Sequence, residues 1–83
     1  MNHEKLDDLF KAYDKLKSVI TLKGQEFEKF EILIEEIKKG KFNEQQAKVE
    51  LNNVWDRCFE PMKNRIMLPE AKELVRIFEE NIR

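Results

Sequence analysis

The fold is decided by the stretch Lys38-Lys39-Gly40-Lys41-Phe42-Asn43-Glu44-Gln45-Gln46, which contains the end of one helix and the start of the next. Two lysines before a glycine are typical of a helix end, because cations favour the negative end of the helix dipole and glycine accepts left-handed backbone angles. Asn43 and Gln46 match a capping box, in which each side chain accepts a hydrogen bond from the other residue's backbone amide. The stretch therefore predicts a tight connection between two helices.

Upstream of this stretch, apolar residues recur at spacings of three and four, which is the period of one helix face. The pattern predicts one helix over residues 3–22 and a second over residues 25–39. The first series consists of Leu6, Leu9, Phe10, Tyr13, Leu16, Val19 and Ile20, and the second of Phe27, Phe30, Leu33, Ile34 and Ile37.

Gly24 lies between the two series and allows two interpretations. A break at Gly24 gives two separate helices, as glycine often ends a helix. The heptad phase nevertheless continues across Gly24 without a skip, which fits one long helix over residues 3–39. A helix of that length would extend roughly 55 Å, too far for a compact small monomer. We favour the break, and keep the long helix in a helical-hairpin dimer as the alternative.

Two prolines mark the boundaries downstream. Pro61 lacks the amide that continues a helix and crowds the preceding turn, so we expect a third helix over residues 43–60. Pro69 suits the first turn of a final helix over residues 69–82, and residues 61–68 form the connector. The apolar positions are Ala47, Leu51, Val54, Trp55, Cys58, Phe59 and Met62 in the third helix, and Ala71, Leu74, Val75, Phe78 and Ile82 in the last.

The composition favours an all-α fold. The chain has 83 residues, 41% apolar and 40% charged, with a net charge of −1 and only two glycines and two prolines. This apolar content is too high for disorder, and so few turn-forming residues favour helices. We expect one helical domain spanning residues 1–83, folded as a small up-and-down bundle of three to four helices.

Several classes of protein are disfavoured by the same sequence. The single cysteine cannot form an intramolecular disulfide, so we expect a reducing, cytoplasmic setting. The N-terminal residues lack the apolar run of a secretory signal, and no segment is long and apolar enough to span a bilayer. Acidic and basic residues are spread evenly along the chain, whereas nucleic-acid binding normally needs a basic face.

Chemistry-bearing residues are few. His3 is the only histidine and lies near the N-terminus, where it has no positioned partner. Cys58 lies on the apolar face of the third helix, which suits a core residue better than a reactive thiolate. The adjacent acidic pairs fall on the polar side of their helices and lack the histidine of a bundle metal site. We expect no enzymatic activity, metal or cofactor.

The most suggestive segment is residues 55–68. It is rich in tryptophan, phenylalanine, methionine and arginine, the types enriched at the centre of protein interfaces. Its apolar face is wider than one packed helix needs, so either Trp55 fills the bundle centre or part of the face contacts another chain. The candidate partner-binding residues are Trp55, Phe59, Met62, Arg65, Ile66, Met67 and Leu68.

These observations predict a non-enzymatic protein-interaction module, such as a small cytoplasmic regulator, inhibitor or assembly factor. Phages and mobile elements encode proteins of this class. The expected partner is another protein, and we also expect a homodimer. A structural alternative is a coiled-coil-like scaffold built on the 3–39 helix. A lesser alternative is a nucleic-acid-associated regulator that uses Lys38, Lys39 and Lys41.

Overall fold

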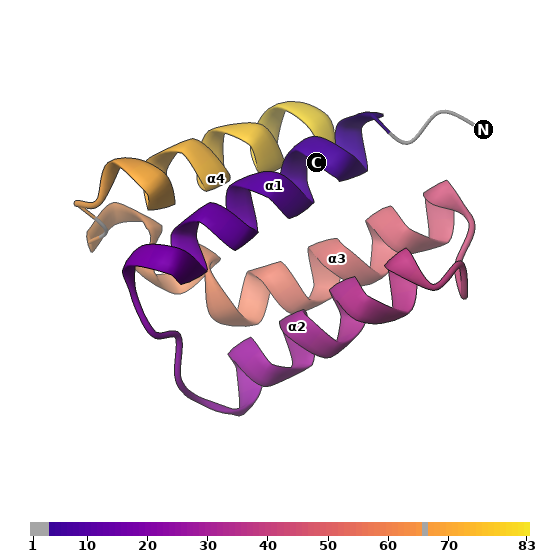
Figure 1. Cartoon of the computed structure of the whole chain (residues 1–83), viewed down its shortest axis with the longest axis horizontal. Helices are drawn as coiled ribbons and strands as arrows, with labels where there is room; N and C mark the ends of the chain where they lie inside the picture. The colour runs from indigo at the N-terminus through magenta and orange to yellow at the C-terminus, as the bar shows by residue number, and fades with distance from the viewer. Residues whose placement is uncertain (1–3, 66) are drawn as a thin grey trace.

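The protein is an all-α bundle. The computed structural model describes residues 4–65 and 67–83, and these residues form four α-helices and a short 3-10 helix (Figure 1). Successive α-helices run in alternating directions, so the prediction of an up-and-down bundle is confirmed. The elements are α1 (Glu4–Val19), α2 (Gln25–Lys38), α3 (Glu44–Cys58), η1 (Glu60–Arg65) and α4 (Pro69–Asn81).

The chain breaks between α1 and α2, so the alternative of one helix over residues 3–39 is wrong. Gly24 has φ 119° and ψ 157°, a backbone conformation that essentially only glycine adopts. The predicted end of the first helix at residue 22 also lies too late. Ile20 and Leu22 leave the helix but still pack against the core from the connection. Their burial explains why the apolar phase crosses a break in the backbone.

The boundary between α2 and α3 has the predicted geometry. Gly40 has φ 83°, and its amide donates to the carbonyl of Ile37 at 3.0 Å. The Asn43 side chain accepts from the Gln46 amide at 2.8 Å, and the Gln46 side chain accepts from the Asn43 amide at 3.2 Å. The capping box is therefore confirmed, and it fixes where α3 begins.

The connector after α3 is partly helical. The last α-helical residue of α3 is Cys58, shortly before Pro61 as predicted. Six residues then form η1, which leads to α4 with Pro69 in its first turn. Ile66, one of the candidate residues, lies outside the described part of the chain.

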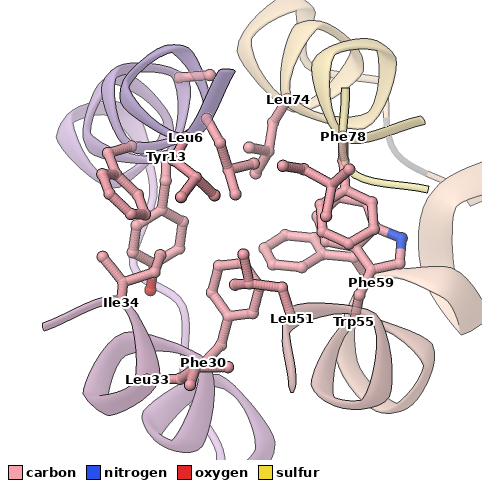
Figure 2. Close-up of a cluster of buried hydrophobic side chains, with 14 of the residues drawn as sticks. Leu6, Tyr13, Phe30, Leu33, Ile34, Leu51, Trp55, Phe59, Leu74 and Phe78 are labelled. Atoms are coloured by element: carbon pink, nitrogen blue, oxygen red, sulfur yellow. The ribbon is translucent and has the colours of Figure 1, made fainter. Parts of the chain in front are cut away.

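The core lies between two pairs of helices. The closest pairs are α1 with α4 and α2 with α3, which form the two layers seen in Figure 1. Aromatic side chains fill the space between the layers (Figure 2). Two seams run between the layers, one between α1 and α2 and the other between α3 and α4. The largest fully buried side chains are Trp55, Tyr13, Phe30, Phe59 and Phe78.

Candidate functional site

Trp55 and Phe59 lie inside the core, which corrects their placement on a contact surface. Their side chains are 0% and 1% exposed. The Trp55 ring stacks on Phe78 of α4 with 3.9 Å between centroids and on Phe59 with 4.6 Å (Figure 2). Phe30 of α2 packs against the rings of Trp55 and Phe59. The alternative in which Trp55 fills the bundle centre is confirmed, because its ring is fully buried and contacts rings of α2 and α4.

The remaining described candidates lie at one end of the bundle, on η1 and at residues 67–68 just before α4. Met62 is half-buried, Arg65 is exposed, and Met67 and Leu68 are 79% and 37% exposed. We call Met62, Arg65, Met67 and Leu68 the turn surface. Leu68 is the N-cap residue of α4, and Pro69 follows it in the first turn of that helix.

Ion pairs place η1 against α4. Lys63 of η1 contacts Glu79 of α4 at 3.1 Å and Glu60 at 2.8 Å. Arg83, beyond the end of α4, contacts Glu60 at 3.0 Å and Asp56 of α3 at 2.6 Å. Hydrogen bonds from Lys63 and then Arg83 lower the pKa of the Glu60 carboxyl, so Glu60 stays ionised at neutral pH. This network therefore positions Met62 and Arg65.

A second candidate surface, which the sequence did not indicate, is a groove at the α1–α2 seam. The groove has a volume of about 570 Å³. Two of the residues that line the groove contact each other, since the Lys38 ammonium lies 5.4 Å from the centre of the Phe10 ring. The apolar periodicity predicted that Leu6, Phe10 and Ile37 lie in the core. The tertiary structure shows that these residues also line the groove. The groove is lined by Leu6, Asp7, Phe10, Lys11, Asp14, Ile37, Lys38, Gly40 and Phe42.

Two buried residues, Cys58 and Tyr13, have titratable side chains whose pKa is raised by the core. Burial raises the pKa of the Cys58 thiol to about 12, so Cys58 is a neutral thiol at physiological pH. Burial likewise raises the pKa of the Tyr13 hydroxyl, and the Glu31 carboxylate adds to the effect. Within residues 4–65 and 67–83, no three His, Cys, Asp or Glu side chains are grouped so that they could hold a metal ion.

The basic cluster at the end of α2 is partly paired. Lys41 contacts Glu36 at 3.0 Å, and Lys38 lies 4.0 Å from Glu35. These carboxylates reduce the positive field that phosphate binding requires. Among the described helices, none has the length and apolarity needed to cross a membrane.

No family model matches the chain, and no curated protein or solved structure is similar to it. Its function must therefore be inferred from the chemistry and geometry of its own residues. The turn surface and the groove at the α1–α2 seam are the two candidates for that inference.

Proposed function

We propose that this chain is a non-enzymatic, cytoplasmic protein-interaction module that binds a protein partner through the turn surface. The observation that carries the proposal is the exposure of Met67 and Leu68, at 79% and 37%, next to each other in the connection that leads to α4. Three other large apolar side chains of the described residues are also exposed, namely Val19 at 50%, Ile32 at 59% and Val49 at 54%. These three lie on three different helices, whereas Met67 and Leu68 are adjacent in the chain.

The residue types of the turn surface suit a protein partner. Methionine is unbranched and polarisable, so Met67 and Met62 can adapt to an irregular apolar surface. Arginine is enriched at interfaces because its guanidinium makes several directed hydrogen bonds. Among the described residues, the Arg65 guanidinium donates one hydrogen bond, to the carbonyl of Pro61 in η1 at 3.3 Å. A regulator, inhibitor or assembly factor could use such a surface.

Site-specific photo-crosslinking tests this function. Benzoylphenylalanine is incorporated in place of Met67 in the cells that make the protein, and irradiation is expected to give one discrete adduct. The same probe at Val49 or Ile32, which are 54% and 59% exposed on α3 and α2, serves as the matched control. The proposal fails if position 67 gives no discrete adduct, or if all three positions give the same adducts.

A second variant tests whether the apolar side chains make the contact. Met67→Gln with Leu68→Gln removes the apolar surface of both side chains. Met67 is 79% exposed, but Leu68 is only 37% exposed, so stability should fall by about 1 kcal/mol through the lost burial of Leu68. A probe placed at Arg65 should then lose its adduct, whereas Val49→Gln should leave that adduct unchanged. An adduct that survives the double substitution would remove the turn surface from the contact.

The mass of the adduct distinguishes the two expected partners. A product of twice the chain mass identifies a second copy, and any other mass identifies a different protein. The scaffolding alternative has lost its 3–39 helix, because α1 and α2 are separated at residues 20–24. A homodimer through the turn surface stays a proposal that sedimentation of the Met67→Gln, Leu68→Gln variant can test.

A further inference from the structure

We propose that η1 is a strap held against the α3–α4 seam, and that it opens while the four α-helices stay folded, so that solvent reaches the indole N–H of Trp55. The proposal concerns the closed bundle itself and does not depend on the turn surface binding a partner. Three independent features of the described residues support it.

The first feature is an unpaired donor in the core. The Nε1 atom of Trp55 is buried and has no hydrogen-bond acceptor among the described residues. A buried indole N–H normally has an acceptor, because losing its bond to water without replacement is unfavourable. In Figure 2 this nitrogen lies on the side of the Trp55 ring that faces away from Tyr13 and Ile34. The chain neighbours of the stacked Trp55 and Phe78 rings, Asp56 and Glu79, pair with Arg83 and with Lys63 of η1, which brings η1 to this part of the α3–α4 seam. Opening on that side would give the donor a water molecule.

The second feature is the weak anchoring of η1. No side chain of η1 is buried, whereas α2, α3 and α4 each bury at least three. A 3-10 helix also has poorer hydrogen-bond geometry than an α-helix. Segments with few buried apolar contacts open at a lower free energy than the rest of the fold. We therefore expect η1 to open before the α-helices do.

The third feature is the kind of contact that joins η1 to α4. Two ion pairs make this link, Lys63 to Glu79 at 3.1 Å and Arg83 to Glu60 at 3.0 Å. All four side chains are between 30% and 43% exposed. Exposed ion pairs are weak and are screened by salt. The contacts that hold the strap thus include ion pairs that salt can loosen, next to an aromatic stack that salt does not weaken.

The test measures the exchange of the indole proton with water by NMR. The chain has one tryptophan, so the Nε1–H signal is unique. In the variant Lys63→Gln with Arg83→Gln, exchange at low salt should be about fivefold faster than in the wild type, the factor expected for two weak exposed pairs. Adding about 0.5 M NaCl should speed exchange in the wild type and have little effect on the variant.

Arg76→Gln is the matched control, because Arg76 pairs with Glu73 and Glu80 within α4 and makes no link to η1. Its indole exchange should equal that of the wild type. The proposal is overturned if exchange in the double variant is unchanged. It is also overturned if exchange accelerates only as much as the backbone amides of α2 do, since the whole bundle would then be opening. If the double variant does not fold, the wild type alone gives the test. Indole exchange that does not become faster with added NaCl would then overturn the proposal.

Discussion

At the scale of single residues, Gly24 is the position where the backbone depends most on residue type. Its φ of 119° and ψ of 157° lie in a region that side chains with a Cβ avoid. A Cβ built at Gly24 would meet no atom within 4 Å, so any cost of a substitution comes from backbone strain and not from a clash. The position thus separates conformational strain from packing.

Gly24→Ala should lower the free energy of unfolding by about 1–3 kcal/mol, the usual cost of holding an L-residue in such a conformation. Urea unfolding followed by circular dichroism measures the change. D-alanine at the same position, introduced by chemical ligation, is the control, because it accepts positive φ and should stabilise the chain. An unchanged midpoint for the L-alanine variant would be evidence against the observed break at Gly24.

Cys58 predicts a loss of stability at alkaline pH. Its thiol ionises near pH 9 when unfolded, whereas burial raises its folded pKa to about 12. The unfolded state therefore binds fewer protons between these values, and stability falls by about 1.4 kcal/mol per pH unit across that window. Below pH 9 the thiol is protonated in both states and this effect vanishes.

Urea titrations of the wild type and Cys58→Ala at pH 7, 9 and 10.5 (values chosen about the unfolded pKa) measure this effect. The variant should lose less stability between pH 9 and 10.5 than the wild type does. Tyr13 keeps a similar contribution above pH 10 in both proteins, because burial raises its pKa as well. Parallel pH profiles for the two proteins would show that Cys58 is accessible to water in the native state.

At the scale of elements, the capping box of α3 is the clearest local determinant. Asn43→Ala removes the acceptor of the Gln46 amide and should cost about 1 kcal/mol of stability. Gln46→Ala removes only the longer 3.2 Å bond to the Asn43 amide, so its cost should be smaller. Thermal unfolding of both variants measures the order. Equal costs, or a larger cost for Gln46→Ala, would contradict this assignment.

The helix ends show what local sequence can and cannot predict. Gly40, Asn43, Pro61 and Pro69 act through their own backbone or nearest turn, so their boundaries could be predicted from the sequence. The end of α1 could not, because Ile20 is apolar and in phase yet is buried from a connection. The spacing of apolar residues indicates which side chains face the core. It does not show whether the backbone at those residues is helical.

At the scale of the whole molecule, the candidate site was the hardest feature to predict. Residues 55–68 have a wide apolar face, and the sequence could not divide it between core and surface. The division depends on how α3 packs against α4, where the Trp55 and Phe78 rings stack with 3.9 Å between their centroids. Among the described apolar residues of this segment, Met67 and Leu68, which follow η1, are the ones that stay exposed. The packing of the complete fold therefore decides that Trp55 and Phe59 lie in the core and that Met67 and Leu68 stay exposed.

Phe30 connects the two layers of the bundle, so its loss should affect the whole molecule. Its ring is fully buried and lies 5.1 Å from Tyr13, 5.4 Å from Phe59 and 6.1 Å from Trp55, measured between centroids. Phe30→Ala should cost about 3–5 kcal/mol. A domain of this size has a total stability of roughly 4–12 kcal/mol, so the variant should be partly or wholly unfolded at 37 °C.

Ile32 provides the control on the same helix. It is 59% exposed, so Ile32→Ala should change the free energy of unfolding by less than about 0.5 kcal/mol. Circular dichroism at 222 nm and the fluorescence of Trp55 should both show loss of structure for Phe30→Ala and neither for Ile32→Ala. Because Phe30 contacts rings from α1 and α3, both signals should be lost in one transition. A variant that keeps its helical signal and a buried tryptophan would mean that the two layers are held together without this ring.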